Sequence, residues 1–163
     1  ASDVYKRQLH RVDPNVPLAD QIGVLKDMQD EGKIKHIGLS QVSVDQLKEA
    51  TAIAPIVSVQ NMYNLSNRQD EDVLDYADAH HIAFIPWFPL ATGELIKDAM
   101  LTNIAQKYSA SPAQIALAWL LKRSDVILPI PGTKSSDHEL QNIQAQDIDL
   151  SQADFDALKA LAK

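Results

Sequence analysis

The sequence has no cysteine, no long apolar run and little positive charge, and each absence removes a class of function. Without cysteine, the 163-residue chain cannot form disulfides, thiol nucleophiles or cysteine-ligated metal sites. No apolar run approaches the roughly 20 residues of a membrane span, and no secretory signal is present. A net charge of −7 disfavours binding to nucleic-acid phosphates. We therefore expect a cytoplasmic enzyme or binding protein.

Five histidines remain as candidate metal ligands, but no two of them are four residues apart. Without that helical spacing we expect no metal site. The composition is otherwise that of an ordinary soluble protein, with 45% hydrophobic and 23% charged residues. A chain of this length is sufficient for one domain with a sizeable core.

The hydrophobic pattern alternates between short apolar segments and segments with helical spacing. The apolar segments predict strands at 9–12, 34–39, 56–60, 83–86 and 126–130. Helices are predicted at roughly 18–32, 43–54, 69–80, 97–108, 111–122 and 137–145, and from Ser151 onward. Ser43 with Gln46 forms a capping box, and Ser111-Pro112 is an N-cap followed by proline at the first helical position.

Apolar strands separated by helices indicate a parallel sheet covered by helices. This rhythm fits either a (β/α)8 barrel or a doubly wound sheet. Polar or aromatic residues follow each strand, and in a barrel those strand ends converge on one pocket. No GxGxxG motif is present, which argues against a Rossmann nucleotide site. We expect a partial (β/α)8 TIM barrel over residues 9–163, made of roughly the last five β/α units and a C-terminal helix.

Six segments in order resemble motifs of the aldo-keto reductases. They are Leu-His-Arg-Val-Asp-Pro at 9–14, Gly-Lys-Ile-Lys-His-Ile-Gly-Leu-Ser at 32–40, Ser-Val-Gln-Asn-Met-Tyr-Asn at 58–64, Ile-Pro-Trp-Phe-Pro-Leu at 85–90, Ser-Pro-Ala-Gln-Ile-Ala-Leu-Ala-Trp at 111–119, and Ile-Pro-Gly-Thr-Lys at 130–134 continuing to Asn142. The resemblance implies an NADP-dependent oxidoreductase that reduces aldehydes or ketones to alcohols, with NADPH as the hydride donor. Members of the family use an Asp, a Tyr, a Lys and a His, and only the histidine maps to this chain, at His10.

The resemblance also implies a nicotinamide site. Ser40, Gln41 and Gln60 match the residues that hold the carboxamide, although most members have asparagine where this chain has Gln41. Trp87 replaces a tyrosine that stacks on the nicotinamide. Phe88 replaces a serine beside the pyrophosphate, so only its backbone can contribute. Pro89 and Leu90 complete this cofactor-binding loop.

The segment 132–142 is expected to hold the rest of the cofactor. Gly132 permits close approach to a phosphate, and a helix N-terminus favours an anion. Lys134 supplies positive charge where the resemblance places the adenosine 2′-phosphate. The complete set expected here is Gly132, Thr133, Lys134, Ser135, His138, Gln141 and Asn142.

The N-terminus departs from the family pattern. The strands that carry the family's Asp, Tyr and Lys have no counterpart here, and Tyr5 and Lys6 are not taken as the missing pair. The resemblance places an Asp-x-Tyr with its Asp five residues before the histidine, whereas Asp3 lies seven residues before His10. Consecutive polar residues at 6–8 would be costly in a buried strand. We interpret residues 1–8 as a non-native, adapter-derived segment, and the chain as a fragment that is inactive alone.

Two alternatives remain open. One is a non-catalytic, nucleotide-sensing subunit with the same fold. The other is an unrelated barrel such as an aldolase, which needs a Schiff-base lysine or a metal cluster at a strand end. The sequence offers only Lys134 for that purpose, within a segment suited to phosphate.

Overall fold

The computed structural model describes residues 5–91 and 93–162. The chain divides into two compact units. The first comprises the residues up to Asn61 together with Asp70–Ile85, and the second comprises Met62–Gln69 with Pro86 to the C-terminus.

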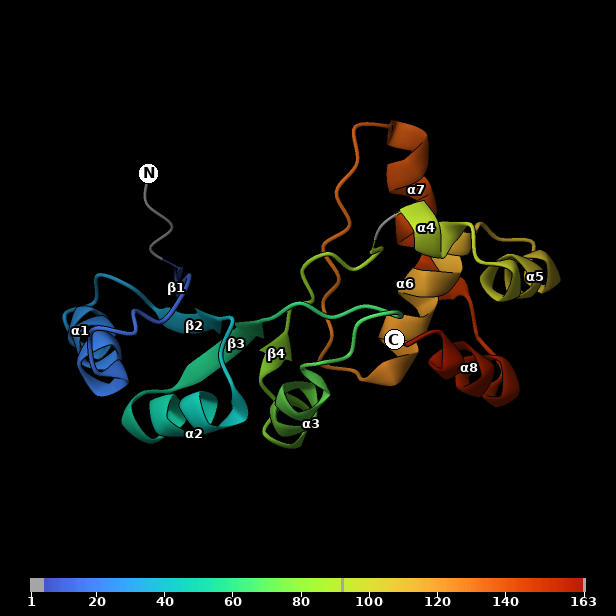
Figure 1. The fold of residues 1–163 in the computed structure, drawn as a ribbon. Helices are drawn as coiled ribbons and strands as arrows, with labels where there is room; N and C mark the ends of the chain where they lie inside the picture. The colour runs from blue at the N-terminus through green and yellow to red at the C-terminus, as the bar shows by residue number, and fades with distance from the viewer. Residues whose placement is uncertain (1–4, 92, 163) are drawn as a thin grey trace. The chain divides into compact units, whose positions relative to one another are not determined.

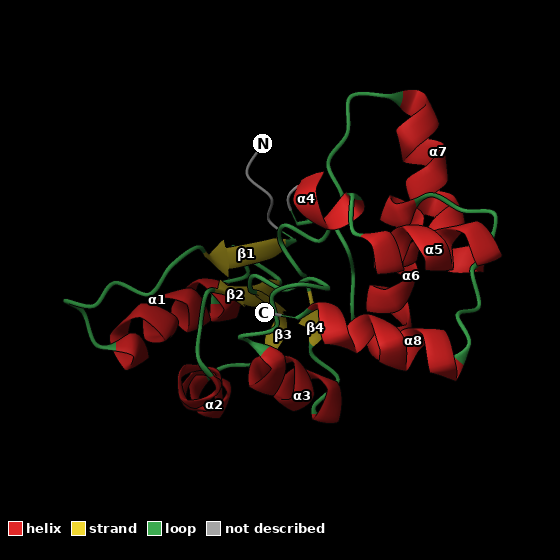
Figure 2. Cartoon of the chain, turned by 45° about the vertical axis from the view of Figure 1, so that its right-hand side comes forward, coloured by secondary structure: helices red, strands yellow, loops and turns green. Residues whose placement is uncertain are grey.

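The first unit is a parallel four-stranded sheet in the order β1-β2-β3-β4. Its strands are β1 (Lys6–Leu9), β2 (His36–Ser40), β3 (Ile56–Gln60) and β4 (Ala83–Phe84). The connecting helices are α1 (Leu18–Asp30), α2 (Val44–Ile53) and α3 (Glu71–Ala79). Figure 2 shows all three helices on one side of the sheet. The expected βα alternation is therefore confirmed in this unit, which is blue to green in Figure 1.

The core of this unit lies between the sheet and its helices. Ile37, Leu39 and Val59 are completely buried, as is Ile22 of α1. Full burial of an aliphatic side chain contributes about 1.5–3 kcal/mol. The capping box predicted at Ser43 is present, because its hydroxyl accepts from Gln46 N and the Gln46 side chain accepts from Ser43 N.

The opposite face of the sheet carries polar residues, although the sequence predicts apolar strands. Gly38 pairs with Ser58, and Ser40 pairs with Gln60. Because side chains alternate along a strand, these four residues share the face opposite Leu39 and Val59. Gly38 is required here, since a Cβ atom at this position would lie 2.5 Å from Ser58 Oγ.

The first strand begins earlier than the sequence predicts. Residues 1–4 of the segment that we interpret as non-native lie outside the described residues, but Lys6, Arg7 and Gln8 are paired with β2. The expectation that polar residues exclude this stretch from the sheet is wrong, because β1 is the sheet's edge and its side chains stay partly exposed. Arg11 and Val12, expected in the strand, follow it.

The second unit is helical. It contains α4 (Gly93–Ile96), α5 (Ala99–Lys107), α6 (Pro112–Arg123), α7 (Ser136–Gln144) and α8 (Gln152–Leu158), with 3-10 turns at Ala145–Asp147 and Lys159–Leu161. Six consecutive residues of α6, from Ile115 to Leu120, are buried. The Trp119 ring stacks between Tyr63 and Phe155, with centroid distances of 6.2 and 5.5 Å. Helix α6 therefore forms the centre of this unit.

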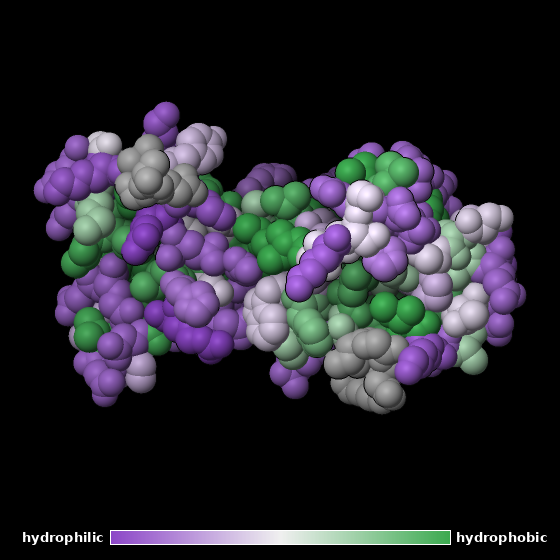
Figure 3. Space-filling model, turned by 90° about the horizontal axis from the view of Figure 1, so that it is seen from above, coloured by the Kyte–Doolittle hydropathy of each residue, from purple (hydrophilic) through white to green (hydrophobic). Residues whose placement is uncertain are grey.

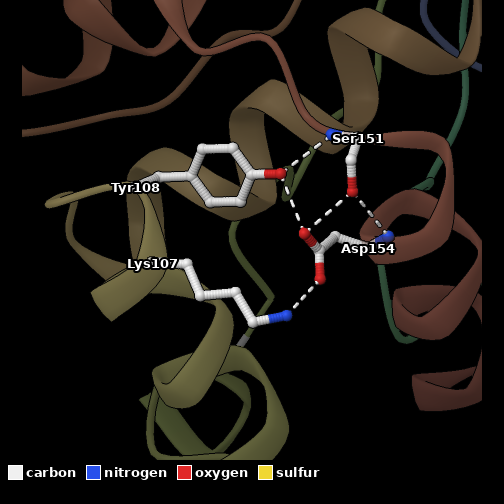
Figure 4. Close-up of polar contacts among 4 residues, drawn as sticks. All are labelled: Lys107, Tyr108, Ser151 and Asp154. Atoms are coloured by element: carbon white, nitrogen blue, oxygen red, sulfur yellow. Dashed lines mark hydrogen bonds and ion pairs between the residues drawn. The ribbon is translucent and has the colours of Figure 1, made fainter.

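A polar cluster ties α5 to α8 (Figure 4). Lys107 Nζ lies 2.6 Å from Asp154 Oδ1, and the Tyr108 hydroxyl donates to Asp154 Oδ2 at 2.8 Å. Ser151 caps α8 by accepting from Asp154 N, and its hydroxyl donates to the same carboxylate. These hydrogen bonds, first among them that from Lys107, lower the pKa of Asp154 from its ordinary value.

The strand predicted at 126–130 does not form. Only Ile127 takes part in a bridge, and the rest of the segment is irregular. Leu128 and Ile130, expected to be buried, are 58% and 45% exposed. A parallel strand needs backbone partners along its length, and this segment has them at a single residue in the described part of the chain.

Helix α7 buries none of its residues in the described structure. Its Leu140 and Ile143 are each 56% exposed. A groove of about 640 Å³ between α6, α7 and the 128–133 segment is lined partly by Leu128 and Ile143. Figure 3 shows apolar patches in green among the polar surface seen from above. The second unit therefore leaves apolar surface uncovered around α7.

Candidate functional site

The ends of β2 and β3 bring two of the predicted residues together. Ser40 and Gln60 are the last residues of their strands and are paired in register. The Ser40 hydroxyl donates to the Gln60 carbonyl oxygen at 2.8 Å, and Ser40 is only 5% exposed. The lone pairs of that hydroxyl remain available to accept a hydrogen bond from an amide ligand.

Gln60 also presents its side chain at this edge. Its Oε1 atom accepts a hydrogen bond from Gln8 Nε2 at 2.8 Å. The amide nitrogen of Gln60 makes no hydrogen bond among the described residues and can donate to a carbonyl oxygen. An amide donor therefore lies beside a hydroxyl acceptor, and this pair is complementary to a carboxamide.

Gln41 follows β2 in a left-handed conformation, with φ of 53°. A residue other than glycine rarely adopts this backbone conformation without support from its surroundings. Gln41 N donates to the Gln60 carbonyl at 3.0 Å, and Asn61 binds Val42, the residue that follows Gln41. Asn61 Oδ1 accepts from Val42 N at 3.2 Å, and its Nδ2 donates to the Val42 carbonyl at 2.8 Å.

Asn61 is therefore a site residue that the sequence analysis did not assign. It is 1% exposed and also reaches Asp70, at the start of α3. Partial burial raises the pKa of the Asp70 carboxyl, while the hydrogen bond from Asn61 acts in the opposite direction. The only signal in the sequence was its place directly after Gln60, which does not reveal a partner 19 residues away.

His10 lies directly after β1 and is exposed. The last paired residue of β1 is Leu9, opposite Leu39, so His10 leaves the sheet at the same edge as Ser40. A histidine at that edge can donate a hydrogen bond to a small ligand there.

The loop after β4 contains the next group of predicted residues. Trp87 is half-buried and forms a parallel bridge with Met62. Phe88 is 45% exposed and has φ of 62°, again in the left-handed region. Pro89 is buried, and Leu90 lines a pocket further along the same unit.

That pocket, of about 320 Å³, gathers most residues predicted from the 132–142 segment. Its predicted members are Leu90, Gly132, Thr133, His138, Gln141 and Asn142. It lies between the start of α6 and one side of α7, whose N-terminus Ser135 caps by accepting from His138 N. Ser135 N in turn donates to Thr133 Oγ1 at 3.1 Å. Both hydroxyl oxygens act as acceptors here, so their hydrogens remain free to donate to an anion.

Other predicted residues do not line this pocket. Trp87, Phe88 and Pro89 are absent from its lining, as are Lys134 and Ser135. Lys134 is exposed and makes no ion pair within the described part of the chain. Its ammonium group is therefore available to a ligand next to the pocket.

Two further observations concern metals and membranes. Among residues 5–91 and 93–162, no three histidine, aspartate or glutamate side chains are grouped so that they could hold a metal ion. In the same part of the chain, no helix combines the length and the apolar character needed to cross a bilayer.

A family model described as the aldo/keto reductase family matches residues 3–163. An uncharacterised oxidoreductase of Schizosaccharomyces pombe is 50% identical over 149 residues, which are 91% of this chain and 49% of that protein. Pyridoxine 4-dehydrogenase of Escherichia coli is 42% identical over 140 residues, which are 86% of this chain and 49% of that protein. The chain thus spans about half the length of the curated relatives it matches.

The fold matches solved structures of the same kind. An aldo-keto reductase from Klebsiella pneumoniae in complex with NADPH aligns with a TM-score of 0.85 and 28% identity, over 97% of this chain and 59% of that one. The expected partial (β/α)8 barrel is therefore confirmed.

Proposed function

The chain belongs to the aldo/keto reductase family, and from this premise we propose that it carries most of the cofactor site of a cytoplasmic NADPH-dependent reductase. The complete protein would reduce aldehydes or ketones to alcohols. The observation that carries the proposal is the pocket along α7, where Gly132 and Thr133 meet His138, Gln141 and Asn142.

The residues present fit NADPH. Phosphate groups can be bound by the N-terminus of α7, by the hydroxyls of Thr133 and Ser135, and by the ammonium of Lys134. Gln141 and Asn142 offer amides to an adenine, and His138 lies next to them on α7. In the first unit, the Ser40 hydroxyl and the Gln60 amide are complementary to the nicotinamide carboxamide. Gln41 joins them at the same edge.

When bound, NADPH supplies the hydride. The role of His10 is to donate a hydrogen bond to the substrate carbonyl oxygen and so to orient it. Trp87 offers a flat aromatic surface for the nicotinamide, and the backbone of Phe88 and Pro89 with the Leu90 side chain bounds the cofactor. No segment of this chain matches the family's proton-donating tyrosine or its lysine partner. The chain alone is therefore expected to bind the cofactor weakly and to leave carbonyl compounds unchanged.

The test joins this chain to the N-terminal half of a family member and follows NADPH consumption with a panel of aldehydes. Pyridoxal belongs in the panel, because a 42% identical relative is a pyridoxine 4-dehydrogenase. Turnover by the joined protein that falls on His10→Ala, with none by the 163-residue chain, supports the proposal. Loss of a positioned general acid typically lowers the reaction rate about 10²–10⁴-fold.

A non-catalytic, nucleotide-sensing subunit is the alternative function, favoured by the same pocket. It predicts that the complete protein binds NADPH but lacks the family's tyrosine and lysine and turns over no carbonyl compound, so the coding sequence upstream of this chain separates the two functions. Turnover by the 163-residue chain itself, lost on His10→Ala, would contradict both the assignment of a missing proton donor and this alternative.

A further inference from the structure

Asn64 joins two loops of the second unit through its side chain. Its Oδ1 atom accepts hydrogen bonds from Ser66 N, Ser66 Oγ and Asn67 N, at 2.9 to 3.0 Å. Its Nδ2 atom donates to the carbonyl oxygen of Phe88, 24 residues away, at 3.1 Å. Asn64 is 1% exposed, so these bonds are shielded from water. The oxygen of the side chain closes its own turn, and the nitrogen binds the loop after β4.

Phe88, whose carbonyl oxygen Asn64 binds, has an unfavourable backbone conformation. Phe88 has φ of 62°, and Ala91, three residues later, has φ of 53°. A bulky residue in the left-handed region is unfavourable and persists only where the surroundings fix it. The Phe88 side chain provides little of that support, because it is 45% exposed. The Phe88 backbone is held instead through its carbonyl oxygen, which accepts hydrogen bonds from Asn64 Nδ2 and, at 3.0 Å, from Ala91 N.

Asn64 itself is firmly held. The preceding residue, Tyr63, is completely buried and stacks on Trp119 of α6. Met62 forms the bridge to Trp87. The loop 62–67 is thus anchored in the helical core, and Asn64 transmits that anchoring to the loop 87–91.

We propose that Asn64 is a positioning residue for the cofactor: by holding the Phe88 carbonyl it fixes the direction of the Trp87 ring and of the Phe88–Pro89 backbone. The inference rests on the proposed NADPH site, which uses both features. Asn64 does not touch the reacting atoms, and it acts through Trp87 and Phe88.

The variant Asn64→Asp isolates the donated hydrogen bond. Aspartate retains an oxygen for the Ser66 and Asn67 donors but cannot donate to Phe88, and it places an acceptor against that carbonyl. Asn67→Asp is the matched control, because it adds the same charge three residues away and retains the oxygen that accepts from Gln69 N.

Two measurements are made on the 163-residue chain. Acrylamide quenching of tryptophan fluorescence reports Trp87, because Trp119 is completely buried and the sequence has only two tryptophans. NADPH titration reports the cofactor site. Asn64→Asp is expected to increase the quenching of Trp87 and to weaken NADPH binding about tenfold, whereas Asn67→Asp behaves as the unaltered chain.

Quenching and NADPH affinity that are the same in Asn64→Asp and Asn67→Asp would overturn the inference, as would altered quenching with unaltered affinity. Failure of the unaltered chain to bind NADPH would instead contradict the proposed cofactor site, and the quenching would still decide whether Asn64 orients Trp87. If Asn64→Asp fails to fold, the double variant with Phe88→Gly decides. Glycine adopts positive φ without strain, so folding should recover, and no recovery would count against the role of Asn64.

Discussion

Asn61 binds the main chain of Val42 through both ends of its side-chain amide, at 3.2 and 2.8 Å. These two hydrogen bonds resemble those between paired strands, and they lie just beyond the ends of β2 and β3. It fixes the loop that contains Gln41, whose φ of 53° would otherwise be unfavourable. The carboxamide-binding edge therefore depends on a side chain that need not touch the ligand.

Asn61→Asp is expected to destabilise the chain by about 1–3 kcal/mol, because the carboxylate cannot donate to the buried Val42 carbonyl and would face it with a charge. The partly buried Asp70 carboxyl nearby adds repulsion. Urea unfolding at pH 7 measures the change. Asn103→Asp, on the exposed side of α5, is the control and should shift stability by less than about 0.5 kcal/mol. Equal effects of the two variants would show that the Asn61–Val42 pair contributes nothing specific.

Gly38→Ala is expected to destabilise the chain by about 1–3 kcal/mol through overpacking, because the new methyl group would lie 2.5 Å from Ser58 Oγ. Removing that oxygen with Ser58→Ala should relieve part of the cost, with a coupling of about 0.5–3 kcal/mol in a double-mutant cycle.

The control for this cycle is Gly23→Ala in α1, where a methyl group would meet nothing within 4 Å. That substitution should stabilise the helix by roughly 0.5–1 kcal/mol. If the stability changes of Gly38→Ala and Ser58→Ala simply add, the two positions do not contact each other, and the close approach of β2 and β3 at Gly38 is wrong.

Lys134→Ala should weaken NADPH binding by roughly tenfold and leave NADH binding nearly unchanged, because only NADPH carries the 2′-phosphate that the ammonium would meet. Titration of both cofactors into the joined protein, followed by tryptophan fluorescence, measures the two affinities. Lys48→Ala, an exposed lysine of α2, controls for the loss of one positive charge. Equal weakening of NADPH and NADH would refute the assigned role of Lys134.

Asp154→Asn should lower stability at neutral pH and have little effect in acid. The pKa of Asp154 is lowered in the folded chain, chiefly by the hydrogen bond from Lys107 and then by those from Tyr108 and Ser151. A lowered carboxyl pKa contributes stability above the unfolded value of 3.8, and this contribution is lost as the pH falls through the folded pKa. Thermal unfolding of both proteins between pH 7 and pH 3 should therefore give melting curves that converge as the pH falls below 3.8. A constant difference across this range would exclude the ionised carboxylate as its source.

Local sequence chemistry determined most helices of this protein. Ser43 with Gln46, and Ser111 with Gln114, satisfy helix N-termini within four residues, so each capping box could be predicted without knowledge of the fold. The motifs from His10 to Asn142 likewise indicated the family, because each is a short run of adjacent residues. The placement of Ser40 beside Gln60 followed from their positions at the ends of parallel strands.

Tertiary structure decided what depends on partners distant in the sequence. Polar residues 6–8 joined the sheet because an edge strand leaves side chains partly exposed, while apolar residues 126–130 formed no strand because they pair at only one residue in the described part of the chain. The positive φ of Gln41 and Phe88 is unfavourable in isolation. Asn61 supports the conformation of Gln41 by binding the adjacent Val42, which is 19 residues from Asn61 in the sequence. Asn64 supports the conformation of Phe88 by donating to its carbonyl oxygen, 24 residues away. Such bonds form only when folding has brought the two loops together, and no local pattern of residues encodes them.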